Sequence, residues 1–426
     1  MAYINDRKGM TQFPVIDYRA HPAFSRAVSA YHYDDQLIAG HVAGIDRAFL
    51  SYRSLPRASI ADAAQVASDI SRIAQEIIQH AADVNAPIIA REWLGSSVAW
   101  AVADIHYECV RLALRDAQYD VSALKAEQQV RLNKLRSDGM YVAEVDDRDF
   151  SAVQRMALSF APDLRRRVSD SPTDRAVYSP SRVSPLGRAI QKLLSNAGVL
   201  EVLSSYKSTR MAIMGTGLEY SRADQAWHAG VYSDIGLAES PLKYLHVDQA
   251  DHLPKAMIYA TPVTNDNGPT GIIRESNTWE RSEFLFRAHK GLDVVTIGRY
   301  GKYVGGAEYR AAARSPELRA IFMQLPIAFQ GSSHFGDDVL PNTPLAQRLL
   351  SQEQKFLSTE RGQVLVFDGA RTLHRGSLVR QGERVALQVG FKNLNDSRVR
   401  AQLSGGDAFS KLMRRIRTLA KMAVQG

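Results

Sequence analysis

Hydrophobic positions follow a helical period through the first part of the chain. The segment Ser59-Ile60-Ala61-Asp62 is typical of a helix start, and apolar residues then recur at helical spacing up to Ile78. A second helix is predicted over residues 92–117 and a third over 121–136. Residues 1–132 are therefore expected to be mainly helical.

In the second half of the chain, the spacing of hydrophobic residues changes from a helical pattern to one typical of strands. Residues 255–263 and 362–368 are runs of apolar and aromatic residues, and residues 385–391 alternate as a half-buried strand does. The first run ends in residues 265–270, whose Asn-Gly chemistry predicts a turn. These patterns indicate strands that follow one another through tight turns.

Three potential metal ligands stand next to these strand signals. In an extended strand alternate side chains face one way, so His246 and Asp248 are expected to point into one pocket. His374 would add a third ligand and complete a two-histidine, one-carboxylate face around a divalent metal. That set leaves coordination positions open, as in non-haem Fe(II) oxygenases. Taken alone, the H-x-D pair fits a surface pair at a strand end equally well.

Four pieces of sequence occur in the order found in one known family. They are H-V-D at 246–248, N-D-N-G-P-T at 265–270, G-Q-V-L-V-F-D-G-A-R-T-L-H-R-G at 362–376, and an arginine on the following strand. Over residues 133–395 the chain resembles the phytanoyl-CoA dioxygenase-like (PhyH-type) branch of the Fe(II)/2-oxoglutarate oxygenases. The resemblance implies an α+β fold with a double-stranded β-helix (jelly-roll, cupin-like) core.

The resemblance also implies site residues and cofactors. His246, Asp248 and His374 would be the catalytic iron ligands, with 2-oxoglutarate as co-substrate and O2 as oxidant. Arg384 would pair its guanidinium with the distal carboxylate of 2-oxoglutarate, and Arg380 is the rival anchor. The acid at position 248 favours hydroxylation over halogenation, because related halogenases carry a small residue there.

The chain departs from the family pattern in several places. Residues 271–277 replace the usual P-G-S-H-like segment, and the gap between Asp248 and His374 is long. An insertion between about 279 and 345 would explain the gap, and it is expected to lie over the pocket mouth. Gly376 holds a position where many members have serine, and Ser377 follows it.

Further pocket residues follow from strand alternation. Lys255, Met257 and Tyr259 share one face of their predicted strand, so Lys255 and Tyr259, with Ser377, are candidates for binding the co-substrate. The Tyr259 hydroxyl either reaches 2-oxoglutarate or belongs to an amphipathic core tyrosine. His252 and His334 are rival metal ligands, which we interpret as rim, substrate-side or structural residues.

We expect three regions: the helical region 1–132, a jelly-roll oxygenase domain over 133–400, and a basic amphipathic helix over 401–426. Because the family core begins near residue 133, the helical region looks like an addition. It would serve substrate recognition or dimerisation, or, as we favour, cover the outer face of the sheet.

Charge and composition indicate which classes of partner the protein could bind and where it is expected to act. The net charge of +8 favours an anionic small-molecule substrate. The basic C-terminal helix would either touch an anionic membrane surface or dock on the core. Basic residues are too dispersed to predict nucleic-acid binding. The single Cys109, the absence of a signal-peptide pattern and the lack of a long apolar run indicate a cytoplasmic protein.

The sequence thus predicts a dioxygenase that oxidises a small molecule and releases succinate and CO2, in secondary metabolism or in envelope glycan or lipid tailoring. Two alternatives stay open. One is a catalytically silent jelly-roll that only binds ligands, and the other is a metal-dependent jelly-roll isomerase that ignores 2-oxoglutarate.

Overall fold

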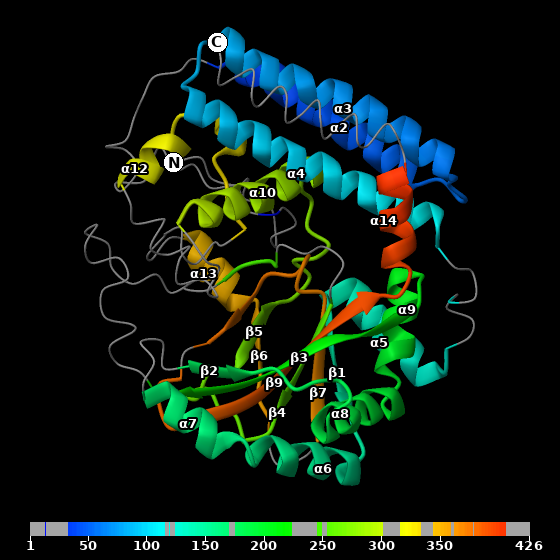
Figure 1. Ribbon diagram of the computed structural model, residues 1–426, viewed down its shortest axis with the longest axis vertical. Helices are drawn as coiled ribbons and strands as arrows, with labels where there is room; N and C mark the ends of the chain where they lie inside the picture. Colours follow the sequence, from blue (N-terminus) through cyan, green and yellow to red (C-terminus); the bar gives the residue numbers. More distant parts are fainter. Residues whose placement is uncertain are drawn as a thin grey trace.

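The computed structural model combines antiparallel sheets with helices on two sides (Figure 1). It describes residues 13, 33–115, 119, 124–169, 175–223, 245–248, 254–300, 316–333, 344–358, 362–377 and 379–405. The described strands form a six-stranded sheet in the order β1-β7-β4-β9-β3-β2 and a three-stranded sheet in the order β6-β5-β8. The fold is therefore α+β.

The strand bounds agree with the runs of apolar residues. The larger sheet contains β1 (Met140–Glu144), β2 (Arg175–Tyr178), β3 (Met211–Arg222), β4 (Lys255–Tyr259), β7 (Gln363–Phe367) and β9 (Glu383–Asn393). The smaller sheet contains β5 (Thr270–Ile273), β6 (Glu353–Phe356) and β8 (His374–Gly376). The turn predicted over 265–270 lies between β4 and β5, where Gly268 has a φ of 82°.

The two faces of β9 have different surroundings. Val385, Leu387 and Val389 point outward into an apolar core shared with helices. Ala386 points inward, into a second cluster that includes residues of β4, β5 and β7. Arg384 shares the inward face, because it is two residues from Ala386 and reaches Gly268 at the start of the smaller sheet. The space between the sheets is thus closed by apolar residues in part and lined by polar residues in part.

Helices cover the outer face of the larger sheet. Their buried residues join the outward-facing residues of β3, β4, β7 and β9 in one apolar core. These helices are α5 (Ala126–Asp138), α6 (Asp147–Leu158), α7 (Ala161–Ser169), α8 (Pro185–Asn196) and α9 (Val199–Lys207).

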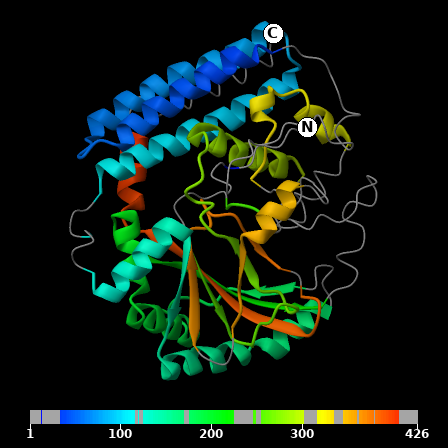
Figure 2. The same ribbon diagram turned by 180° about the vertical axis from the view of Figure 1, so that it is seen from behind.

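The N-terminal helices do not cover that face, so the arrangement favoured from the sequence is wrong. α2 (Asp35–Arg53), α3 (Ile60–Asp83) and α4 (Ile88–Ala113) share a separate apolar core with α10 (Glu283–Tyr300). Figure 2 shows this layer at the opposite end of the sheets from α6 and α8. Helices α5–α9 occupy the outer face of the larger sheet, so α2–α4 pack against the apolar side of α10 instead.

The observed ends of the predicted helices lie within a few residues of their predicted positions. Ser59 caps α3, because its Oγ accepts from the Asp62 N–H at 3.1 Å and the Asp62 carboxylate accepts from the Ser59 N–H at 2.9 Å. The helix expected over 92–117 begins earlier, directly after Pro87, and ends at Ala113. The helix expected over 121–136 begins at Ala126 and ends before Gly139, whose φ is 78°.

The described parts of the stretch expected to be an insertion contain helical segments. They are α10, α12 (Pro316–Phe322) and the 3-10 turn η5 (Ile327–Phe329), and α13 (Pro344–Ser351) follows. After β9 the chain continues into α14 (Asp396–Gly405). Residues 406–426, most of the predicted basic helix, lie outside the described residues. No helix in the described ranges is both long and apolar enough to span a bilayer.

Candidate metal centre

A pair of backbone hydrogen bonds brings the two histidines together. The His246 N–H donates to the His374 carbonyl and the His374 N–H to the His246 carbonyl, each at 2.9 Å. The imidazole centroids are 4.4 Å apart. Among the described residues, His246 makes this contact as an isolated bridge outside the regular strands. The bridge holds the two backbones side by side, so that both imidazoles start from neighbouring positions.

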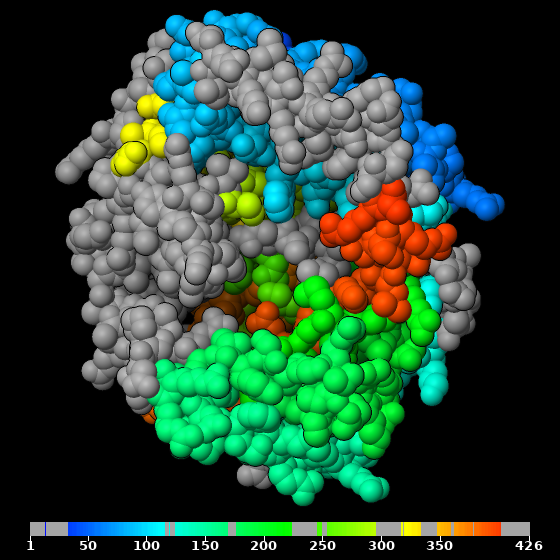
Figure 3. Space-filling view, in the orientation of Figure 1, coloured from blue at the N-terminus to red at the C-terminus, as the bar shows by residue number. Residues whose placement is uncertain are grey.

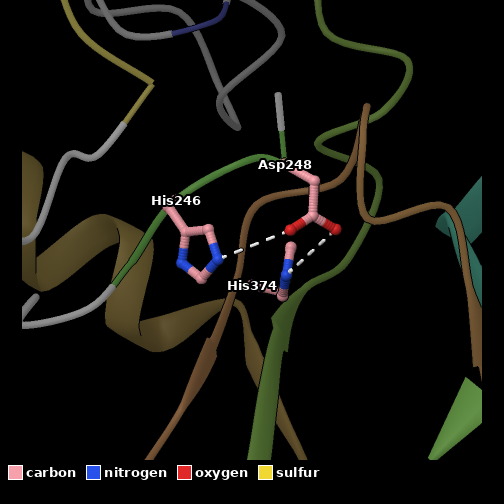
Figure 4. Close-up of side chains that lie close together, drawn as sticks. All are labelled: His246, Asp248 and His374. Carbon is pink, nitrogen blue, oxygen red and sulfur yellow. Dashed lines mark ion pairs between the residues drawn. The ribbon is translucent and has the colours of Figure 1, made fainter. Parts of the chain in front are cut away.

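Asp248 completes the cluster (Figure 4). Val247 is fully buried and its N–H donates to the Ser333 carbonyl, while the Asp248 N–H donates to the Gly369 carbonyl at 2.8 Å. The Asp248 carboxylate lies between the imidazoles, with Oδ1 3.8 Å from His246 Nε2 and Oδ2 3.7 Å from His374 Nε2. The potential ligand atoms of the three residues all lie within 4.8 Å of one another.

The His374 ring is oriented by its other nitrogen. Nδ1 lies 3.0 Å from the Thr372 carbonyl, which can only accept a hydrogen bond. The hydrogen therefore belongs on Nδ1, and Nε2 keeps its lone pair on the side of Asp248. Such a backbone acceptor behind a histidine is usual where the imidazole binds a metal.

The two oxygens of Asp248 have different surroundings. Oδ1 accepts a hydrogen bond from Lys255 Nζ at 2.7 Å. Oδ2 is buried and has no hydrogen-bond partner among the described residues. Burial alone would raise the pKa of Asp248, but the positive charge of Lys255, together with the electrostatic influence of His374 and His246, outweighs it and holds that pKa below its ordinary value. The carboxylate is therefore ionised, with one oxygen available to a cation.

The absence of a side chain at Gly369 leaves room for the Asp248 carboxylate. A Cβ at this position would collide with Asp248 Oδ2 and would stand 3.2 Å from His374 Cε1. The side chains of His246 and Lys255 are 26% and 21% exposed, so the cluster is open on one side. Figure 3 shows the molecule hollowed near the middle of one face, with segments coloured green and orange at the base.

Arg384 is buried between the sheets. Its Nη1 donates to the Gly268 carbonyl, and its Nη2 donates to Glu219 Oε1 at 2.8 Å. Its Nε is buried without a hydrogen-bond partner in the described part of the chain. Arg380, the rival anchor, is exposed, and its N–H donates to the Asp266 carbonyl. Of the two arginines, Arg384 alone points into the space between the sheets.

Ser377 and Tyr259 differ in what their hydroxyls contact. Ser377 Oγ is buried with no hydrogen-bond partner among the described residues, and its N–H donates to the Pro269 carbonyl beside Gly268. The Tyr259 hydroxyl donates to Thr270 Oγ1 at 2.8 Å and accepts from the Thr270 N–H. Tyr259 therefore has the contacts of an amphipathic core tyrosine.

Several residues around the cluster were not predicted from the sequence. Glu219, the partner of Arg384, lies on the inward face of β3, where alternation of polar and apolar residues could have identified it. On α10, Lys290 contacts the turn before His374 and Asp293 contacts the Ser332–Ser333 segment beside Val247, and no sequence signal indicates this. His252 and His334 lie outside the described residues.

Comparison with known proteins identifies distant structural neighbours only. No family model and no curated protein matches the chain by sequence. Among solved structures, the apo form of EctD from S. alaskensis has 12% identity and a TM-score of 0.37, with 64% of this chain and 78% of EctD covered. SnoN, a non-heme alpha ketoglutarate dependent epimerase from nogalamycin biosynthesis, has 9% identity and a TM-score of 0.33, with 63% and 84% covered.

The carbocyclase SnoK, also from nogalamycin biosynthesis, has 10% identity and a TM-score of 0.31, with 64% of this chain and 85% of SnoK covered. EctD has also been solved with 2-oxoglutarate and 5-hydroxyectoine, and SnoN with Fe3+, alpha ketoglutarate and a nogalamycin compound. Identities and TM-scores this low do not establish a family or a reaction for this chain, so the functional argument rests on the site geometry.

Proposed function

We propose that this protein is an Fe(II)/2-oxoglutarate-dependent dioxygenase that oxidises a small molecule by hydrogen abstraction, with hydroxylation as the favoured outcome. The observation that carries the proposal is the convergence of His246, Asp248 and His374, with Asp248 Oδ2 buried and lacking a hydrogen-bond partner in the described residues. A buried carboxylate oxygen without a donor is costly unless a cation takes that place.

The donor set suits ferrous iron. Two imidazole nitrogens and one carboxylate oxygen are the protein ligands of the non-haem Fe(II) oxygenases, and they leave positions open for other ligands. His246, Asp248 and His374 would hold the metal, while the Thr372 carbonyl fixes the His374 tautomer and Lys255 holds the second oxygen of Asp248. Binding through Oδ2 alone would follow from this arrangement.

The co-substrate also has a suitable place. Arg384 Nε and Ser377 Oγ are buried donors with no described partner, and both residues contact the segment around Gly268. We infer that they bind the distal carboxylate of 2-oxoglutarate. When bound, metal and co-substrate together supply an oxidation by O2 that leaves succinate and CO2, and this chain's residues orient the reactants and limit access of water.

Several broader features belong to the same proposal. The two antiparallel sheets would be the halves of a double-stranded β-helix of the phytanoyl-CoA dioxygenase type, within a domain over residues 133–400. We also propose an anionic small-molecule substrate and a cytoplasmic reaction, the latter supported by the single, fully buried Cys109. Membrane contact through residues 401–426 remains a proposal from the sequence.

The test is iron binding and 2-oxoglutarate turnover by the full chain. We expect the wild type to bind one equivalent of Fe(II) under anaerobic conditions and to release succinate from 2-oxoglutarate when O2 and ascorbate are added. His246→Ala and Asp248→Ala should lose both properties. His41→Ala is a matched control, because His41 lies on α2 and pairs with Glu76, away from the cluster.

Each alternative predicts a different result. A metal-dependent isomerase would bind Fe(II) through the same residues but release no succinate. A silent binding module would bind no iron, or would bind it equally well in His246→Ala. Either result would overturn the proposed function.

A further inference from the structure

One helix of the expected insertion is linked to both segments that carry the triad, to one of them directly and to the other through Ser332 and Ser333. Lys290 and Asp293 are three residues apart on α10 and therefore project from the same side of the helix. Both side chains are buried, with 0% and 2% of their surface exposed. Lys290 contacts the turn before His374, and Asp293 contacts Ser332 and Ser333 beside the H-x-D segment.

Asp293 holds the segment next to His246 and Asp248. Its carboxylate accepts from Ser332 Oγ at 2.9 Å, from the Ser333 N–H at 2.7 Å and from Ser333 Oγ. The Ser333 carbonyl in turn accepts from the N–H of Val247, the residue between the two ligands. A shift of the Ser332–Ser333 segment would therefore move the H-x-D segment with it.

Lys290 holds the turn that leads to His374. Its Nζ donates to the Ala370 carbonyl at 2.8 Å, and its ammonium lies 4.3 Å from the centre of the Phe286 ring. Ala370 follows Gly369, whose carbonyl accepts from the Asp248 N–H. The same turn thus contacts Asp248 directly and ends at His374.

Stability alone does not account for two buried charges here. Removing an ammonium and a carboxylate from water is costly, and apolar residues of similar volume often replace buried ions at no loss of stability. The described hydrogen bonds of both charges go to segments adjacent to the triad, where small displacements would change the distances between the potential ligand atoms.

We propose that Lys290 and Asp293 are positioning residues of the metal site, and that α10 sets the separation of the two segments that carry its ligands. The inference rests on the proposed function in taking the triad as the metal site. α10 is itself fixed to the N-terminal helices, because Ser97 Oγ donates to the Ala288 carbonyl at 2.6 Å and Arg287 pairs with Asp104 at 2.7 Å. The N-terminal helices thereby brace the site through α10.

The test is a Co(II) titration of the full chain, followed by the visible absorption of the bound ion. Asp293→Asn and Lys290→Met should each weaken Co(II) binding about 10- to 100-fold, the usual effect of removing a residue that orients a metal ligand. The absorption of bound Co(II) should also change, because its intensity depends on ligand geometry. The metal-free variants should still unfold cooperatively.

Asp149→Asn is the matched control. It makes the same chemical change as Asp293→Asn at another buried carboxylate, but Asp149 lies on α6 and pairs with Lys192 of α8, away from α10. It should lower the melting temperature while leaving Co(II) affinity within about twofold of wild type. Wild-type affinity and spectrum in either positioning variant would overturn the inference, as would failure of both to fold. Failure of the wild type to bind Co(II) would instead refute the proposed metal site.

Discussion

Replacing Gly369 by alanine tests whether the orientation of Asp248 matters. An added Cβ would collide with Asp248 Oδ2 and would stand 3.1 Å from Phe367 Cε2 and 3.2 Å from His374 Cε1. The Phe367 and His374 side chains are buried and leave little room to move. The Asp248 carboxylate must therefore rotate, against the hydrogen bond that Lys255 makes to its other oxygen.

The expected loss can be estimated from the cost of overpacking. Adding a methyl group to a filled site typically costs about 1–3 kcal/mol. If this overpacking cost falls on the conformation of Asp248 that presents Oδ2 to the metal, the affinity for Fe(II) should fall about 5- to 150-fold. The conversion follows because about 1.4 kcal/mol corresponds to a factor of ten in affinity. The metal-free protein avoids most of this cost, because the carboxylate can turn away.

The assay is calorimetric titration of Gly369→Ala with Fe(II) under anaerobic conditions, beside thermal unfolding without metal. Gly376→Ala is the matched control, since Gly376 lies two residues after His374 and an added Cβ there meets no described atom within 4 Å. The control should bind Fe(II) as the wild type does. Equal affinities in the two variants would refute the role given to Asp248 Oδ2.

Two other substitutions test the surroundings of the site. Arg384→Lys should raise the KM for 2-oxoglutarate about 10- to 150-fold, because lysine has no Nε donor and loses charge-assisted hydrogen bonds worth about 1.5–3 kcal/mol. The affinity for Fe(II) should be unchanged. An unaltered KM in succinate-release assays would exclude Arg384 as the anchor of 2-oxoglutarate. Glu283→Gln should destabilise the protein by about 3–5 kcal/mol in urea unfolding at pH 7, because it breaks buried ion pairs with Arg287 and Arg371. Burial would raise the pKa of Glu283, but Arg371 and Arg287 hold it well below its ordinary value. Its contribution is therefore present at neutral pH and lost as the pH falls below that ordinary value, so the gap between wild type and variant should narrow in acid.

Much of the fold could be predicted because local patterns and tertiary contacts agree. The Ser59 capping box, the Asn-Gly turn and the alternation in β9 all specify an element from residues close in sequence. Strand alternation also predicted that Lys255 and Tyr259 share a face, which the structure bears out through their contacts with Asp248 and Thr270. The same alternation could not show that the Tyr259 hydroxyl has its partner in Thr270.

The errors arose where two distant segments compete for one surface. Nothing in the first helices indicates whether they cover the larger sheet or α10, because both are apolar surfaces. The pairing of Arg384 with Glu219 joins strands far apart in sequence, and the contacts of Lys290 and Asp293 join a helix to two loops. Side-chain pairs of this kind depend on the assembled fold and leave no periodic signal.

The charges around α10 link the helical layer at this end of the sheets to the segment that carries His374. A chain of ion pairs runs from Asp104 on α4 through Arg287 and Glu283 to Arg371, with contacts of 2.6–2.7 Å. Arg371 lies three residues before His374, in the turn that Lys290 also holds. The N-terminal helices are thus connected to the ligand-bearing turn by buried charge pairs as well as by apolar packing. A displacement of α4 would therefore be transmitted to α10 and to the turn before His374 unless these ion pairs broke.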